Sequence, residues 1–138
     1  MRKVLIGRLA IVFVGAGLAM ASDAAYAAGP KGDPARGETV YEECSGCHSL
    51  TENVVGPRHC GVVGRKAGSV TDYPSYTSVM KGSGLTWNAA KLDEFLANPL
   101  SYLEGTAMGF AGLSDPGARA DVIAYLEKAG KDPALCPK

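Results

Sequence analysis

The feature that most constrains this chain is the pentapeptide Cys44-Ser45-Gly46-Cys47-His48. Residues three apart on a helical turn share one face, so both sulfurs can reach the same edge of a porphyrin. The next side chain can then place a ring nitrogen under the iron. The arrangement is typical of covalent haem attachment, with Cys44 and Cys47 as anchors and His48 as the proximal ligand. A thioredoxin-like redox pair, half a zinc site and a chance match are the alternatives.

The first 27 residues have the features of a secretory signal peptide. A basic start precedes an apolar run of 12 residues over 9–20, and small residues at 25 and 27 predict cleavage after Ala27. A retained membrane anchor is the alternative, but spanning a bilayer takes roughly 18 apolar residues. We therefore expect 1–27 to be a cleaved signal peptide and 28–138 to form one domain in the periplasm, without stable membrane insertion.

The charge balance and the export signal argue against several classes of partner and of cysteine site. The full chain has 14 basic and 14 acidic residues, and loss of the leader leaves 11 basic and 13 acidic ones. Such a chain has no basic stripe, which argues against a nucleic-acid partner. Export places the cysteine pair in an oxidising compartment, where a dithiol or a zinc site is not kept reduced, and this favours haem.

Hydrophobic periodicity predicts an all-α chain with three main helices. Each follows a side chain that can cap it, namely Asp33, Thr86 and Asp115. The first helix brings its apolar stripe and Cys44 to the same side, and the stripe of the last helix is expected to pack on it. The segment 68–84 is predicted to be a long irregular loop, and no stretch alternates long enough to predict a strand.

Two more residues have chemistry suited to a haem site. Met108 lies in a glycine-containing loop, and its thioether is a soft ligand suited to iron. Met80 is the other methionine beyond the leader, and core packing is the ordinary role of a methionine. The carbonyl of Pro57 can accept the ring N–H of a proximal histidine, although an ordinary turn proline explains it equally well.

From residue 33 to 129 the sequence resembles the class I c-type cytochromes, close to mitochondrial cytochrome c and related soluble bacterial electron carriers. Beside the haem motif, the resemblance is carried by Gly37, Tyr41, Gly56-Pro57, Gly64-Arg65-Lys66, Ser75-Tyr76-Thr77, Gly84-Leu85-Thr86-Trp87, Asn98-Pro99, Gly105-Thr106, Met108, Phe110-Ala111-Gly112 and 121–126. It implies a cytochrome c fold. In that fold the N- and C-terminal helices cross, while a third helix and long loops wrap one covalently bound haem c.

The resemblance also implies a set of site residues. Met108 becomes the distal iron ligand opposite His48. Tyr76 and Trp87 are similar to donors that bond an inner propionate, and Arg65 to the cation that screens it; packing is the alternative role for the two aromatic residues. The complete haem environment implied is Pro57, Arg65, Tyr76, Trp87, Phe95, Thr106 and Phe110, with Phe110 at the exposed haem edge.

Two further cysteines, Cys60 and Cys136, lie outside the haem motif. The family fold brings the segment after Pro57 near the end of the last helix, and export favours oxidation. The resemblance therefore implies a Cys60–Cys136 disulfide, with free thiols as the alternative. His59 is expected to be a surface residue and not a ligand.

The chain also departs from the family's eukaryotic members, among other things in a shorter loop between His48 and Pro57. They have a tyrosine on the second helix where this chain has Phe95, so a hydroxyl donor near the methionine sulfur is missing. Lysines at their haem edge are replaced here by Leu100, Ser101 and Ala107. These replacements put docking through a ring of lysines in doubt.

The function implied is that of a soluble periplasmic one-electron carrier, a monomer and not an enzyme. It would shuttle electrons between a reductase and an oxidase or dehydrogenase. With both axial positions filled by His48 and Met108, no coordination position remains for a substrate. The alternatives are a dedicated cytochrome c subunit of one periplasmic dehydrogenase, and a haem peroxidase or gas-binding protein with an open distal position.

Overall fold

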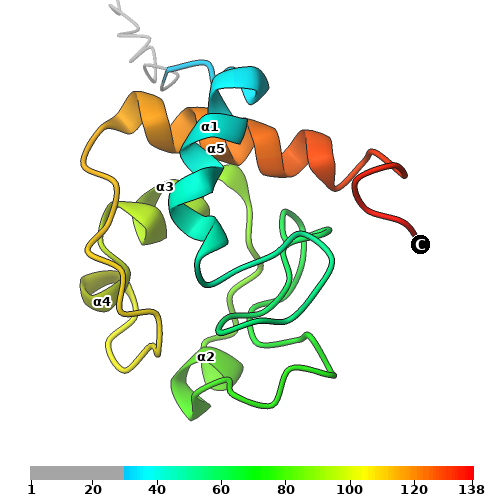
Figure 1. The fold of residues 1–138 in the computed structure, drawn as a ribbon. Coiled ribbons are helices and arrows are strands. Elements are labelled where there is room, and N and C mark those ends of the chain that lie inside the picture. Colours follow the sequence, from blue (N-terminus) through cyan, green and yellow to red (C-terminus); the bar gives the residue numbers. More distant parts are fainter. Residues whose placement is uncertain (1–29) are drawn as a thin grey trace, which may run out of the picture.

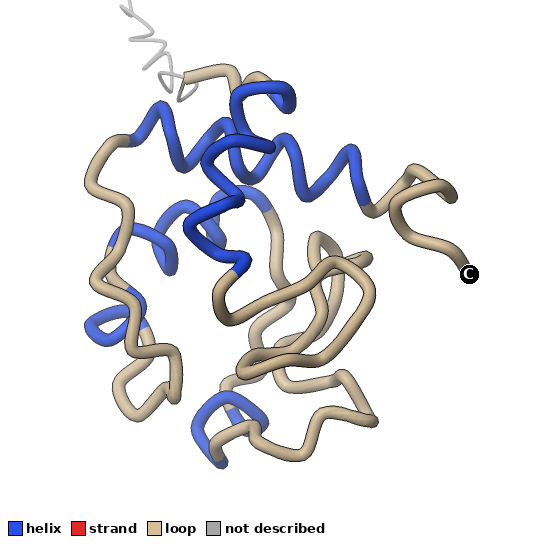
Figure 2. The backbone as a smooth tube through the Cα atoms, viewed as in Figure 1, coloured by secondary structure: helices blue, strands red, loops and turns tan. Residues whose placement is uncertain are grey.

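A computed structural model describes residues 30–138, so the predicted signal peptide over 1–27 lies outside the described residues. The elements are helices: α1 (Pro34–Ser45), α2 (Ser78–Gly82), α3 (Ala89–Ala97), α4 (Pro99–Tyr102) and α5 (Pro116–Ala129). Figure 2 shows these helices joined by loops over the described residues. Within 30–138 an isolated bridge between Lys66 and Thr86 is the only extended pairing. The all-α prediction is therefore confirmed. None of the five helices combines the length and the apolar character that a membrane crossing needs.

Two of the predicted helix starts are found as expected. The carboxylate of Asp33 accepts from the amide of Ala35 at 2.8 Å and caps α1, and Asp115 caps α5 through the amide of Gly117 at 2.9 Å. In both helices a proline follows the cap, where its missing N–H leaves no hydrogen bond unmade. The sequence pattern therefore placed both terminal helices correctly.

Helix α3 begins later than predicted. Its cap is Asn88, whose side-chain oxygen accepts from the amide of Lys91 at 2.9 Å, so the assignment of Thr86 as cap is wrong. The main chain next to Thr86 is hydrogen-bonded to a distant segment and not to the helix. The amide of Trp87 donates to the carbonyl of Arg65 at 2.9 Å. This extended pairing holds the chain out of the helix until Asn88.

The predicted loop over 68–84 contains the short helix α2. Thr77 caps it by accepting from the amide of Met80 at 3.2 Å. The segment lies at the far end of the molecule from α1 and α5 (Figure 1). A helix of 5 residues is too short to leave a readable hydrophobic period, which explains why the sequence did not reveal it.

Helices α1 and α5 cross in close contact, as the family resemblance implied (Figure 1). At Gly37 a Cβ atom would overlap the carbonyl oxygen of Asp121 and come within 2.8 Å of the Cβ of Tyr125. Across the same contact, the Asp121 carboxylate accepts from Arg36 Nε at 2.7 Å and from the amide of Asp33 at 2.6 Å. The absence of a side chain at Gly37 therefore lets the two backbones approach. The ion pair between Arg36 and Asp121 holds the helices together at the same contact.

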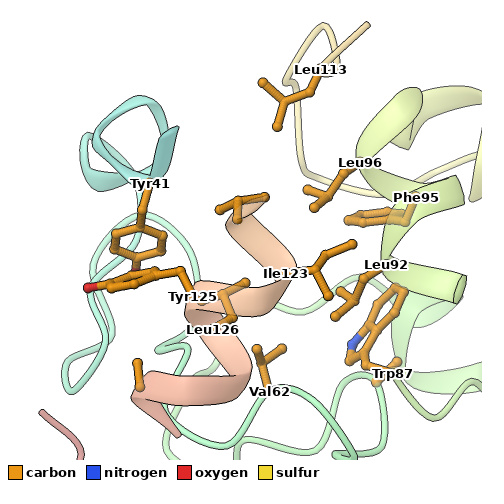
Figure 3. Close-up of a cluster of buried hydrophobic side chains, with 13 residues drawn as sticks. Tyr41, Val62, Trp87, Leu92, Phe95, Leu96, Leu113, Ile123, Tyr125 and Leu126 are labelled. Atoms are coloured by element: carbon orange, nitrogen blue, oxygen red, sulfur yellow. The ribbon is translucent and has the colours of Figure 1, made fainter. Parts of the chain in front are cut away.

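The hydrophobic core lies between α5 and α3. Ile123 of α5 faces Leu92 of α3 and the Trp87 indole, which is only 6% exposed (Figure 3). On the other side of α5, the rings of Tyr125 and Tyr41 have centroids 5.2 Å apart. The core thus continues from α3 through α5 to α1, whose last turn carries the cysteine motif.

Candidate functional site

The cysteine motif is formed where α1 ends. Cys44 lies in the last turn of the helix, and its carbonyl accepts from the amides of Cys47 at 3.1 Å and of His48 at 2.9 Å. These bonds hold the three side chains on one tight turn. Neither Cys44 nor Cys47 is part of a disulfide, so both sulfur atoms can serve as attachment points.

The protonation of Cys44 separates the haem interpretation from a thioredoxin-like one. Burial, with smaller contributions from Glu43 and Cys47, raises the pKa of the Cys44 thiol to about 11. A thiol–disulfide exchange pair needs a cysteine whose pKa is lowered, because the thiolate is the nucleophile. Cys44 has the opposite environment, which argues against the redox-pair alternative.

His48 is held in the form that binds a metal. Its Nδ1 donates to the carbonyl of Pro57 at 2.8 Å, which leaves the lone pair on Nε2. Burial lowers the pKa of His48, and the bond to Pro57 opposes this effect in part, so the ring favours its neutral form. A Cβ at Gly56 would come within 2.6 Å of His48 Nδ1, so only glycine fits beside the ring.

His59 is not the surface residue that the sequence predicted. Its ring stacks on that of His48 with centroids 4.1 Å apart and planes inclined by 21°. Burial, with smaller contributions from the neighbouring His48 and Arg65, lowers the pKa of His59 to about 3. The prediction is wrong because the chain after Pro57 folds back beneath the haem motif, a long-range arrangement that no local pattern reveals.

Met108 lies in the loop between α4 and α5. It is partly buried against the hydrophobic core, and its amide donates to Thr106 Oγ1 at 3.3 Å. Gly105 and Gly112 have φ values of +86° and +99°, a region that favours glycine, and so they shape both ends of this loop. Phe110, from the same loop, is also partly buried against the core.

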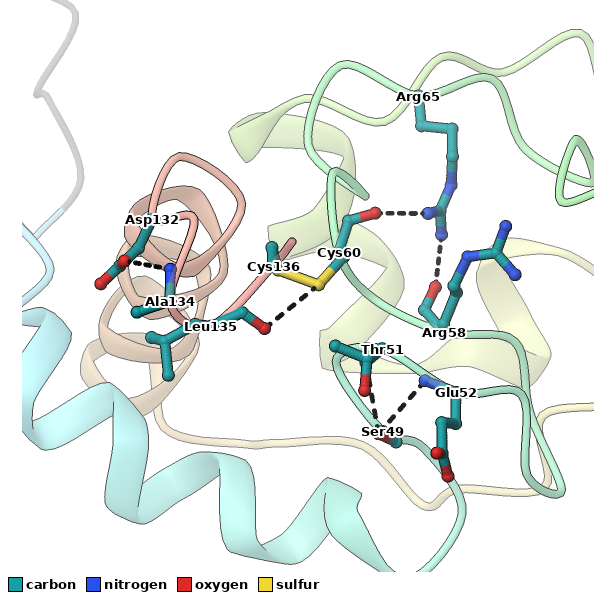
Figure 4. Close-up of a disulfide and its surroundings, with 10 residues drawn as sticks. All are labelled: Ser49, Thr51, Glu52, Arg58, Cys60, Arg65, Asp132, Ala134, Leu135 and Cys136. Atoms are coloured by element: carbon teal, nitrogen blue, oxygen red, sulfur yellow. Dashed lines mark hydrogen bonds between the residues drawn. A yellow bond between two sulfur atoms is a disulfide. The ribbon is translucent and has the colours of Figure 1, made fainter. Parts of the chain in front are cut away.

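Arg65 is tied to the loop that carries His59. Its guanidinium donates to the carbonyl of Arg58 at 2.7 Å and to that of Cys60 at 2.9 Å (Figure 4). Burial lowers its pKa, and the nearby Tyr76 opposes that effect. Two nitrogens of the Arg65 guanidinium therefore bind main-chain oxygens. Its role as the cation that screens a propionate stays a prediction.

Three of the four aromatic residues expected around the haem pack against other aromatic rings. The rings of Trp87 and Phe95 have centroids 5.0 Å apart, and Phe95 meets Tyr102 edge-on at 5.9 Å. Tyr76 lies edge-on to Tyr73 at 4.8 Å. Trp87 and Phe95 are thus brought together within the core, while Tyr76 lies in the loop that precedes α2.

The structure joins Cys60 to Cys136 in a disulfide. Their Cα atoms are 5.5 Å apart, and the bond links positions separated by 76 residues (Figure 4). The tail turns toward Cys60 after α5, because the amide of Cys136 donates to the carbonyl of Asp132 at 2.8 Å. The bond thus connects the segment after Pro57 with the end of α5.

The residues present fit a covalently attached haem. Two thiols share one turn, an imidazole has its Nε2 unbonded among the described residues, and a single loop supplies a thioether. Partly buried apolar side chains pack against the hydrophobic core, among them Leu50, Leu85, Leu103 and Phe110. The donor set fits a haem that Cys44 and Cys47 would anchor, with a nitrogen and a sulfur as candidate axial ligands.

Comparison with known proteins supports this identification. No protein-family model matches the chain. It is 48% identical to cytochrome c2 of Rhodomicrobium vannielii, over 84% of this chain and 91% of that protein. It is 42% identical to cytochrome c-554 of Methylosinus trichosporium, over 73% of this chain and 78% of that protein.

A solved structure gives the same result for the fold. Cytochrome cH from Methylobacterium extorquens superposes with a TM-score of 0.68 and 45% sequence identity, covering 70% of this chain and 99% of that one. The likeness extends over more than two thirds of this chain in the solved structure and in cytochrome c2 alike. The chain therefore belongs to the class I c-type cytochromes, which carry one covalently attached haem c.

Proposed function

We propose that this cytochrome is an exported, monomeric one-electron carrier in which His48 and Met108 are the axial ligands of the haem iron. The observation that carries the proposal is the bond of 2.8 Å from His48 Nδ1 to the Pro57 carbonyl, which leaves Nε2 as the coordinating atom. Bound haem c supplies one-electron exchange between Fe(II) and Fe(III). With the nitrogen of His48 on one axial side of the iron and the sulfur of Met108 on the other, no coordination position is left open for a substrate.

The remaining roles of the chain are to anchor, orient and shield. Cys44 and Cys47 hold the porphyrin through one edge, and Pro57 keeps the proton on the outer nitrogen of His48. Apolar side chains of the core exclude water, so the two redox states meet nearly the same surroundings. A site of this kind transfers electrons and performs no bond chemistry, which supports a carrier rather than an enzyme.

The electron donor and acceptor are proposed to be other redox proteins, a reductase and an oxidase or dehydrogenase. At the positions where eukaryotic relatives have lysines, Leu100 is 51% exposed, and Ser101 and Ala107 are also exposed. Exposed uncharged side chains support docking through apolar contact rather than through charge pairing. The rate of reaction with a partner is then expected to depend weakly on salt.

Periplasmic location is supported by the signal features of 1–27 and by a cysteine pair placed for oxidation. The intact mass of the protein purified from a periplasmic extract checks this. We expect a chain that begins at Ala28 and carries one haem c. A mass that includes residues 1–27 would contradict cleavage of the signal.

Replacement of each methionine tests the ligand assignment. Met108→Leu is expected to abolish the weak far-red absorption band that an iron–thioether bond gives in ferric cytochromes, and to open the reduced iron to carbon monoxide. Met80→Leu is the matched control, because Met80 is also a partly buried methionine packed against the core. The control should keep the band and stay closed to carbon monoxide.

Two results would overturn the proposal. Loss of the band in the Met80 variant and its retention in the Met108 variant would move the ligand to α2. Tight carbon monoxide binding by the unmodified reduced protein would show an open distal position and favour a gas-binding or peroxidase function.

A further inference from the structure

The ring of His48 is confined on several sides by different parts of the chain. Its Nδ1 is bonded to the Pro57 carbonyl, and the backbone of Gly56 lies so close that a Cβ there would overlap the ring. The ring of His59 stacks on it at 4.1 Å, with an inclination of 21°. The hydrogen bond restrains the position of Nδ1 and so the rotation of the ring, and the stacked ring of His59 restrains the same plane from one face.

Hydrogen bonds restrain the main chain at His59, and this restraint holds its ring in place against His48. The amide of His59 donates to the carbonyl of Ser49 at 2.9 Å, and its carbonyl accepts from the amide of Val62 at 2.8 Å. The flanking carbonyls of Arg58 and Cys60 both accept from the Arg65 guanidinium. The stacked ring is therefore attached to a part of the loop with little freedom to shift.

Further support comes from the residues on either side of this loop. The disulfide ties Cys60, which follows His59, to the tail after α5 (Figure 4). The ring of Tyr41 in α1 meets the ring of His59 edge-on, with centroids 5.7 Å apart. His59 thus lies between the tyrosine at the α1–α5 crossing and the haem-motif histidine.

Hydrogen bonding by the Nδ1 atom of His59 does not account for a histidine at this position. This atom is buried and finds no hydrogen-bond partner among residues 30–138. An aliphatic side chain would avoid the cost of an unpartnered polar atom. The contacts of the flat ring with the rings of His48 and Tyr41 are the interactions that favour a histidine here.

We propose that His59 is a positioning residue for electron transfer, whose stacked ring sets the orientation of the His48 plane about the bond from Nε2 to the iron. The inference rests on the proposed ligation by His48. The orientation of an axial imidazole decides which iron orbital shares its unpaired electron with the porphyrin. A fixed plane of the His48 imidazole therefore gives the ferric haem one distribution of the unpaired electron instead of a mixture of several.

Proton NMR of the ferric holoprotein tests this proposal, because the shifts of the haem methyl groups report the orientation of the axial imidazole. His59→Leu, which removes the flat ring, is expected to shift all four methyl resonances and change their spread. His59→Phe, which restores a flat ring, is expected to return the pattern toward that of the unmodified protein. The matched control is Ile123→Ala, a buried change on α5 that should lower stability and leave the pattern in place.

The possible outcomes separate this inference from the proposed function. If His48 shows no iron-shifted ring protons in the unmodified protein, both fail. If His48 is bound and His59→Leu leaves the methyl pattern unchanged, or His59→Phe changes it equally, the positioning role is wrong and the ligation stands. Should the Leu variant yield no holoprotein, nuclear Overhauser contacts between the two imidazole rings in the reduced protein decide the matter, and their absence would overturn the inference.

Discussion

Two regions of this cytochrome hold their shape by different means. At the crossing of α1 and α5, close packing dominates, and Val122 and Ala129 are 1% and 0% exposed. In the segment 49–65, which follows the haem motif, the chain is irregular and is held by main-chain hydrogen bonds, by Arg65 and by the disulfide. The first region is held by a packed contact between two helices. The second is a loop held by separate hydrogen bonds and by a disulfide.

The difference shows how the two parts serve the haem site. The helix crossing brings the end of α1, and hence Cys44, to a fixed place in the fold. The loop presents the Pro57 carbonyl and the His59 ring to His48, tasks that need carbonyls and side chains aimed away from regular structure. Packing therefore positions Cys44, the proposed anchor, and the contacts made by the loop orient His48, the proposed ligand.

The largest effect is expected from removing the disulfide with Cys60→Ser and Cys136→Ser together. Closing a segment of 76 residues contributes at most about 4 kcal/mol to stability in the chain-entropy model. Guanidinium unfolding of the oxidised holoprotein measures the loss, and hydrogen exchange should quicken first at the amides of His59 and Cys60. Thiol titration of the denatured holoprotein is the control, because the unmodified protein should show no titratable thiol while Cys60 and Cys136 are bonded. Two titratable thiols would count against the bond.

A nearly equal effect is expected from Gly37→Ala at the helix crossing. The new Cβ would meet backbone and Cβ atoms of α5, so the helices must separate, at a cost of about 3 kcal/mol. Gly82→Ala is the control, since a Cβ there meets nothing within 4 Å among the described residues. It should change stability by about 1 kcal/mol or less, in the stabilising direction. Equal losses in the two variants would show that the crossing is not closely packed.

This comparison also explains what the sequence could predict. Asp33 and Asp115 mark helix starts through local rules of capping, and the period of apolar residues predicts the faces of α1 and α5. The start of α3 could not be read in the same way, because the extended pairing of Trp87 with Arg65 is a long-range contact. Within the loop, the position of His59 follows from the fold of the chain around it and from no pattern of its own.

A smaller effect, with a definite pH dependence, is expected from Asp121→Asn. The Arg36 guanidinium, and then the Asp33 amide, hold the pKa of the Asp121 carboxyl below its usual value. A lowered pKa contributes stability above the unfolded value of about 4, and this stability is lost as the pH falls through the native value. The variant should therefore be less stable than the unmodified protein at pH 7, and the difference should vanish in acid. Urea unfolding between pH 7 and pH 3 tests this; a difference that grows in acid would contradict the assignment.

The smallest effect is expected at Tyr41, where the two regions meet. Its ring contacts Tyr125 across the helix crossing and His59 in the loop, but its buried hydroxyl has no hydrogen-bond partner within the described chain. Tyr41→Phe keeps both ring contacts and removes the unpartnered group, so we expect stability to rise by about 1 kcal/mol. Tyr125→Phe is the comparison, because the Tyr125 hydroxyl is not among the buried unpartnered atoms. Thermal unfolding of the two holoproteins measures the difference, and a loss of stability in the Tyr41 variant would mean that its hydroxyl makes a bond that ties the crossing to the loop.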